Sequence, residues 1–164
     1  MNTLPRSYLF VPGHRGDRFD KVMAAGADAV ILDLEDAVPV EAKDGAREAV
    51  SRWLHHRERR AGDPQVLVRV NAAPTPQHAD DVAACRLGVG PGVDGIVLPK
   101  SETPAELAAL AHALPGVALL PLVETAQGLA ASLELARAPG VQRLVFGSID
   151  FQHDLGIDGD GEEL

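Results

Sequence analysis

The sequence predicts an α/β fold built on a parallel sheet, and two patterns lead to this prediction. Short apolar runs rich in β-branched residues recur along the 164-residue chain, and each run is almost continuously hydrophobic. Such runs are typical of strands that are covered on both faces, as in a parallel sheet. Alanine-rich segments with helical periodicity separate the runs, which indicates repeated β/α units with right-handed crossovers. The pattern fits either a closed barrel or an open, doubly wound sheet.

Six of the runs are predicted to be strands, and four of the segments between them are predicted to be helices. The strands cover residues 7–12, 29–36, 66–71, 95–100, 118–125 and 143–150. The helices cover residues 18–25, 39–56, 104–114 and 127–137. The third helix has a well-marked start, because Thr103 is a good N-cap and Pro104 suits the first helical position.

The composition argues against several classes of protein. A formal net charge of −9 makes the chain a poor candidate for nucleic-acid binding, which depends on neutralising phosphates. The single cysteine, Cys85, allows neither an intrachain disulfide nor a cysteine-rich zinc site. We see no signal-peptide pattern and no run of the roughly 18 apolar residues that a membrane helix needs. We therefore expect a cytoplasmic protein that binds neither nucleic acid nor membrane.

Polar residues follow the carboxyl ends of the predicted strands, and in a parallel sheet these ends share one edge. The residues are Arg15, Glu35, Asp36, Arg69, Asn71, Lys100, Glu124, Thr125, Ser148 and Asp150. A single charged residue at a strand end is usually a helix cap or a solvated loop residue. Charged residues after almost every strand instead indicate a functional site at this edge.

Glu124 and Asp150 form the clearest candidate pair, because they end two successive predicted strands. Neighbouring carboxylates repel each other, and a hard divalent cation removes the conflict. Mg²⁺ suits such a pair, since it takes one or two carboxylates and completes its shell with substrate oxygens and water. The alternative is that both residues cap helices or accept loop hydrogen bonds. Thr125 is an equally good cap, which leaves Glu124 available for a ligand.

Arg69 lies within an apolar strand, where a guanidinium is costly unless it is paired. Two interpretations stay open from the residues alone. Arg69 forms a structural bridge to Glu35 or Asp36, or it holds a substrate carboxylate through two hydrogen bonds. Because Glu35 and Asp36 are adjacent, their side chains face opposite ways in a strand, and at most one points into a site.

Several motifs occur in order along essentially the whole chain. They are SYLFVPG at 7–13, GADAVILDLEDAV at 26–38, VRVN at 68–71, DGIVLPK at 94–100, LVETAQG at 122–128 and FGSID at 146–150. In this order they resemble the citrate lyase β-subunit-like proteins of the HpcH/HpaI aldolase/citrate lyase superfamily. The resemblance implies a TIM-type (β/α) barrel. Residues 1–164 then form a single, incomplete barrel domain with about six of the eight β/α units.

The resemblance also implies an activity. It implies a Mg²⁺-dependent carbon–carbon lyase that cleaves or forms a CoA or acyl-carrier thioester of a hydroxyacid such as citryl or malyl. The products of cleavage are an acyl thioester and a 2-oxoacid. A thioesterase on the same scaffold and a catalytically silent assembly subunit are the alternatives, and retention of Arg69, Glu124 and Asp150 argues against the silent subunit. A homo-oligomer, either a trimer or a hexamer, is expected.

Residue roles follow from the matched motifs. Glu124 and Asp150 correspond to the metal ligands, and Glu124 also faces the substrate. Arg69 corresponds to the catalytic arginine that holds the oxoacid or hydroxyacid, and Arg15 lies near the thioester or its phosphates. Glu35 and Asp36 are candidates for acid/base or supporting roles. The acid/base aspartate of the family corresponds to a region beyond Leu164, so we expect the chain to be part of a longer enzyme.

Overall fold

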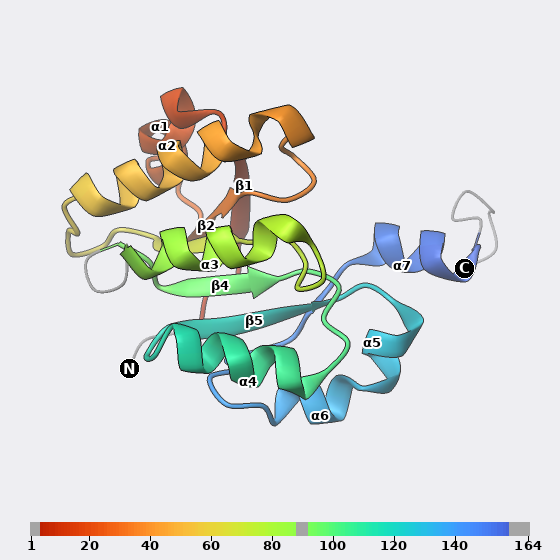
Figure 1. The fold of residues 1–164 in the computed structure, drawn as a ribbon. Coiled ribbons are helices and arrows are strands. Elements are labelled where there is room, and N and C mark those ends of the chain that lie inside the picture. The colour runs from red at the N-terminus through yellow and green to blue at the C-terminus, as the bar shows by residue number, and fades with distance from the viewer. Residues whose placement is uncertain (1–3, 88–91, 158–164) are drawn as a thin grey trace.

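A computed structural model describes residues 4–87 and 92–157 of the chain. In this part of the protein, six parallel strands form one sheet in the order β1-β2-β3-β4-β5-β6 (Figure 1). The strands are β1 (Tyr8–Pro12), β2 (Ala29–Asp33), β3 (Gln65–Arg69), β4 (Gly95–Leu98), β5 (Ala118–Val123) and β6 (Val145–Phe146). The parallel α/β fold predicted from the apolar runs is confirmed, and the strands follow one another in chain order.

Helices connect the strands. The α-helices are α1 (Phe19–Met23), α2 (Lys43–His56), α3 (Pro76–Leu87), α4 (Pro104–Ala113), α5 (Ala126–Ala130), α6 (Ser132–Ala136) and α7 (Ser148–Leu155). Two 3₁₀ turns, η1 (Gly16–Arg18) and η2 (Val40–Ala42), precede α1 and α2. Among the described residues, no helix combines the length and the apolar character that a membrane crossing requires.

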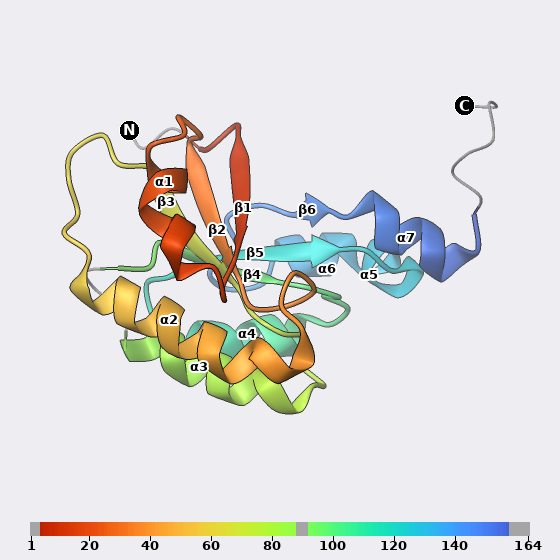
Figure 2. The same ribbon diagram turned by 90° about the horizontal axis from the view of Figure 1, so that it is seen from above.

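The sheet curls, and its two faces bury different apolar clusters. Figure 2 shows the strand direction turning from β1 to β6 while α2, α3 and α4 cover the convex face. That face carries the larger cluster, which includes Val30, Leu32, Val66, Val68, Ile96, Leu98 and Leu119. Alternate residues turn to the concave face and form a second cluster of Ala29, Ile31, Leu67, Val97, Leu120 and Leu122. Burial on both faces explains why the strands read as continuous apolar runs, and the curl favours a barrel over an open sheet.

The helix ends confirm one prediction in detail. Thr103 caps α4, because its hydroxyl accepts a hydrogen bond from the Glu106 amide while the Glu106 side chain accepts one from the Thr103 amide. This reciprocal capping box satisfies two backbone donors that the helix itself cannot pair. Pro104 occupies the first helical position, as predicted.

The structure differs from the sequence prediction in three places. The predicted strand 143–150 is wrong in its second half, since β6 ends at Phe146 and Asp150 lies in the first turn of α7. The predicted helix 127–137 is two short helices, α5 and α6, with Ala131 between them. The periodicity indicates no helix over α3, whose sequence is rich in alanine and aspartate and offers few large apolar residues.

Cys85 provides a test of this packing. It lies on α3 with 1% of its surface exposed, and burial, with a contribution from the Asp81 carboxylate, raises the pKa of its thiol. Because only the thiolate reacts, we expect a disulfide reagent to label folded protein at least about a thousandfold more slowly than urea-unfolded protein. Equal labelling rates at pH 8, followed spectroscopically, would contradict the position of α3 against the sheet.

Candidate active site

The carboxyl edge of the sheet is organised around an ion pair between Asp33 and Arg69. These two residues are direct register partners on β2 and β3, and their side chains turn to the concave face. Nε of Arg69 donates to Oδ1 of Asp33 over 2.7 Å, and Nη2 donates to Oδ2 over 2.6 Å. The two-point contact makes Asp33 the main partner of Arg69, in addition to the expected bridge to Glu35. The parallel register, which the sequence does not display, brings Asp33 opposite Arg69.

Glu35 is the second partner of Arg69, and it links the arginine to Lys100. Nη1 of Arg69 lies 3.0 Å from Oε2 of Glu35, and Nζ of Lys100 donates to Oε1 over 3.1 Å. Asp36 is 60% exposed, with its carboxylate 3.9 Å from the guanidinium. The structure therefore turns Glu35 inward and Asp36 outward. Burial raises the pKa of the Glu35 carboxyl, while the charge of Arg69 opposes this shift.

Lys100 joins three carboxylates at this edge. Its Nζ lies 3.1 Å from Oε1 of Glu35, 3.1 Å from Oδ2 of Asp150 and 3.9 Å from Oε1 of Glu124. Its backbone amide donates a further hydrogen bond of 2.8 Å to Oε1 of Glu124. The carboxylates raise the pKa of the Lys100 ammonium although burial acts against them. Lys100 therefore stays charged and holds the acidic side chains of β5 and α7 together.

Glu124 and Asp150 thus lie on the same side of the sheet, as the sequence predicts. Glu124 is buried directly after β5, and burial raises the pKa of its carboxyl to about 7. Gly147 makes room for it, because a methyl group there would lie 2.8 Å from Oε2 of Glu124. Thr125 caps α5 by accepting a hydrogen bond of 3.0 Å from the Gly128 amide, so Glu124 is not needed as the cap.

A polar network supports the loop after β2. Nζ of Lys43, on α2, donates to the carbonyl oxygens of Leu34 and Glu35 and to Oδ1 of Asn71. Asn71 in turn donates to buried Asp81 on α3 through its backbone amide and its side-chain amide. Each of these buried groups has a partner, as buried polar groups require. The network fixes the loop that presents Glu35.

Arg15 occupies the turn after β1, as its sequence position predicts. Its guanidinium forms an ion pair with Asp17 over 2.7 Å at the protein surface. Arg15 therefore lies on the side of the sheet where the strands end. Its ion pair is with Asp17, which does not belong to the cluster around Arg69 and Lys100.

One residue of the cluster, Asp33, was not among the sequence candidates, and Lys100 was named there as a polar strand end without a role. Asp33 sits inside the apolar run 29–36, and its only signal is a carboxylate at the end of a strand that is otherwise buried. Lys100 has a similar signal at the end of β4, together with a backbone φ of 48°, which is unusual for a residue other than glycine. The strand register, and no local pattern in the sequence, shows that Asp33 faces Arg69.

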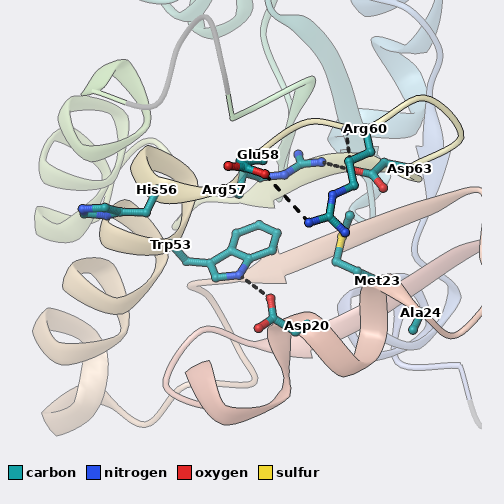
Figure 3. Close-up of a pocket in the computed structure, with 9 residues that line it drawn as sticks. All are labelled: Asp20, Met23, Ala24, Trp53, His56, Arg57, Glu58, Arg60 and Asp63. Atoms are coloured by element: carbon teal, nitrogen blue, oxygen red, sulfur yellow. Dashed lines mark hydrogen bonds and ion pairs between the residues drawn. The ribbon is translucent and has the colours of Figure 1, made fainter.

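A separate cleft lies at the opposite end of the strands, where α1 and α2 end (Figure 3). Several of its polar side chains are paired with one another. Nε1 of Trp53 donates to Asp20 over 3.0 Å, and Nη2 of Arg57 donates to Asp63 over 3.3 Å. The Arg57 guanidinium also lies 5.4 Å from the centre of the Trp53 ring. These contacts stabilise the ends of the helices. Residues at the amino-terminal ends of barrel strands usually serve stability and not catalysis.

The sequence and the fold of this chain are similar to those of known proteins. Residues 6–164 match the HpcH/HpaI aldolase/citrate lyase family. The chain belongs to this family. A citrate lyase subunit beta-like protein of Deinococcus radiodurans is 38% identical over 95% of this chain and 57% of its own length. A (3S)-malyl-CoA thioesterase of Cereibacter sphaeroides is 35% identical over 92% of this chain and 51% of its own length.

A solved relative confirms the fold of the family in this chain. The citrate lyase beta subunit of M. tuberculosis, complexed with oxaloacetate and magnesium, superposes with a TM-score of 0.73 and is 35% identical. The match covers 92% of this chain and 61% of that chain. The curled sheet is therefore a partial TIM-type barrel, and the chain spans about half the length of the curated relatives it matches.

The cluster is chemically suited to a divalent cation. Five carboxylates, those of Asp33, Glu35, Asp36, Glu124 and Asp150, form ion pairs with the two cations Arg69 and Lys100. Within residues 4–87 and 92–157, no group of three or more metal-ligating side chains has the geometry of a protein-only metal cage. An ion that takes its remaining ligands from substrate and water, between Glu124 and Asp150, fits this donor set.

The Asp33–Arg69 pair generates a stability prediction. Replacing Asp33 with Asn removes the two-point charged partner of the guanidinium and leaves Glu35 as its one close carboxylate. The free energy of unfolding is therefore expected to fall by about 3 kcal/mol, the lower end of the range for breaking a buried pair. Asp36→Asn is the matched control, because the exposed Asp36 carboxylate lies 3.9 Å from the same guanidinium, and it should cost less than about 1 kcal/mol. Urea unfolding measures both. Equal effects of the two changes would contradict the structural role of the pair.

Proposed function

We propose that this chain carries the metal- and oxoacid-binding half of a Mg²⁺-dependent carbon–carbon lyase. The substrate is a CoA or acyl-carrier thioester of a hydroxyacid such as citryl or malyl, and cleavage yields an acyl thioester and a 2-oxoacid. The observation that carries this proposal is the partly buried cluster of Arg69, Lys100, Glu35, Glu124 and Asp150 at the carboxyl edge of the sheet. Membership of a family named for aldolase and citrate lyase supports it.

Glu124 and Asp150 are the proposed Mg²⁺ ligands. Nζ of Lys100 lies 3.9 Å from the Glu124 carboxylate and 3.1 Å from the Asp150 carboxylate, which supports the proposal that one cation can bind both. The magnesium and oxaloacetate complex of the M. tuberculosis relative supports both the metal and the 2-oxoacid. A bound Mg²⁺ supplies a Lewis acid that polarises the oxygen at C2 of the substrate.

Arg69 is the proposed anchor for the substrate carboxylate. Asp33 takes two of its five N–H groups, on Nε and Nη2, and Nη1 forms an ion pair with Glu35 without a hydrogen bond. Hydrogens on both terminal nitrogens are therefore left for a ligand. The Phe10 ring, 5.2 Å from the centre of the guanidinium, steadies the plane of the group. A held guanidinium loses little freedom when it binds, so Arg69 is both a structural partner of Asp33 and a preorganised carboxylate site.

The proposed cleavage removes the proton of the substrate hydroxyl and breaks the adjacent carbon–carbon bond. The bonding electrons pass to the thioester as an enolate, which then takes a proton to give the acyl thioester. Within this chain, Asp36 is the first candidate for the base, since it is exposed next to the Arg69 anchor. The resemblance assigns this role instead to an aspartate beyond Leu164. Arg15 is proposed to lie toward the thioester or its phosphates.

A thioesterase is the second candidate function, because a relative that is 35% identical carries the name (3S)-malyl-CoA thioesterase. The same metal, arginine and thioester contacts serve hydrolysis if water attacks the thioester carbonyl. The cytoplasmic location and the trimeric or hexameric assembly stay predictions of the sequence.

The metal site generates a binding prediction. Glu124→Gln and Asp150→Asn each remove one ligand charge, so each should weaken Mg²⁺ binding by more than about tenfold in a calorimetric titration of the full-length protein. Asp80→Asn is the control for loss of one negative charge, because Asp80 is exposed on α3, and it should leave the affinity unchanged. Unchanged Mg²⁺ affinity in both site variants would reject Glu124 and Asp150 as metal ligands.

The nature of the products separates the two functions. Full-length protein supplied with malyl-CoA and Mg²⁺ is expected to release a 2-oxoacid together with acetyl-CoA, and chromatography with mass detection identifies both. Arg69→Lys should lower this turnover by about 10²-fold or more, because an ammonium does not reproduce the planar guanidinium. Release of malate with free CoA would establish the thioesterase and reject the lyase.

A further inference from the structure

Lys100 stands apart in the backbone of this protein. Among the described residues other than glycine, it alone has a positive φ, at 48°. A left-handed conformation is strained for such a residue, and glycine would adopt it without this strain. The turn after β4 therefore retains a strained lysine where glycine would be easier, which points to a use for the side chain.

The contacts of Lys100 show what that use is. The left-handed turn lets the backbone amide and the ammonium of one residue reach the same acidic cluster, with the amide on Glu124 and Nζ on Glu35 and Asp150. The two Nζ contacts differ in their surroundings. The side chain of Glu35 is 8% exposed, whereas that of Asp150 is 38% exposed and that of Lys100 is 42% exposed. The contact with Asp150 is therefore open to water and exchangeable, and the contact with Glu35 is enclosed.

We propose that Lys100 is the internal counter-cation of the metal site, and that a divalent cation must displace its ammonium from Asp150 in order to bind. This inference rests on the proposed function, since it concerns the same two ligands, Glu124 and Asp150. Direct ligation at about 2.0–2.1 Å brings Mg²⁺ closer to Asp150 than the ammonium lies. The two cations repel each other, so the ammonium leaves its water-exposed contact with Asp150 and keeps its contact with Glu35.

In this position Lys100 is a positioning residue. Before metal binds, its positive charge offsets the repulsion between the carboxylates of Glu124 and Asp150. After metal binds, it continues to neutralise Glu35. Glu35 needs this second cation because Arg69 also pairs with Asp33. Mg²⁺ and the Lys100 ammonium therefore compete for the Asp150 carboxylate, and the measured affinity for Mg²⁺ reflects the difference between their binding free energies. This competition also predicts opposite effects of removing the ammonium: the metal-free protein loses stability, and the affinity for Mg²⁺ rises.

The test compares Lys100→Met, which keeps an unbranched side chain as far as Cε and removes the ammonium, with Lys21→Met. Lys21 is exposed on α1 and controls for the loss of one positive charge. In calorimetric titrations of full-length protein with MgCl₂ at pH 8, Lys100→Met should bind Mg²⁺ about 5–150-fold more tightly than the wild type, the usual range of coupling between sites. Lys21→Met should bind like the wild type. Lys100→Arg, which retains the charge, should bind no more tightly than the wild type.

Thermal unfolding gives a second measurement that also covers poor folding of the variant. Without metal, the Tm of Lys100→Met should fall, and saturating Mg²⁺ should raise it by more than it raises the Tm of the wild type. Equal or weaker Mg²⁺ binding in Lys100→Met, with an equal or smaller rise in Tm, overturns the role of Lys100. Failure of the wild type itself to bind Mg²⁺ would overturn the proposed metal site instead, so the two failures are distinguishable.

Discussion

The ion pair between Asp33 and Arg69 is the contact on which the rest of the site depends. A guanidinium on the concave face of a curled sheet requires a partner, and the parallel register supplies one on the adjacent strand. Asp33 also accepts hydrogen bonds from the backbone amides of Glu35 and Ala37, over 2.9 Å and 3.2 Å. The same carboxylate therefore fixes the arginine and shapes the loop that turns Glu35 inward. Catalytic groups held in this way lose little freedom when a ligand binds.

The second constraint is an excess of negative charge in a partly buried space. Repulsion among Glu35, Glu124 and Asp150 is relieved by Lys100, whose turn is strained in the process. The raised pKa of Glu124 is a sign of the same conflict, because its chief cause is burial and the neighbouring carboxylates add to it. A site in this state favours an additional cation. The fold concentrates acidic side chains where adjacent strands and α7 meet, which supports the proposed metal site.

Much of this arrangement could be predicted from the sequence, and the rest depended on geometry. Continuous apolar runs predicted the strands, and polar strand ends predicted the edge that carries Glu124 and Arg69. Asp33 was missed because its importance lies in the strand register, which no local pattern encodes. Asp150 was placed at a strand end, since the run before it is apolar, whereas Gly147 ends β6 early and Asp150 lies on α7. The convergence of Lys100 on three carboxylates is a property of the turn conformation and not of composition.

Crystallography with Mn²⁺ as an anomalous substitute for Mg²⁺ tests the central claim most directly, because it reports the metal and its neighbours together. The account predicts an anomalous peak between the carboxylates of Glu124 and Asp150 in the full-length protein, with the Asp33–Arg69 pair intact beside it. The Lys100 ammonium should have left Asp150 and should remain on Glu35. A peak elsewhere, or an Arg69 that has left Asp33 to join the metal site, would contradict the account.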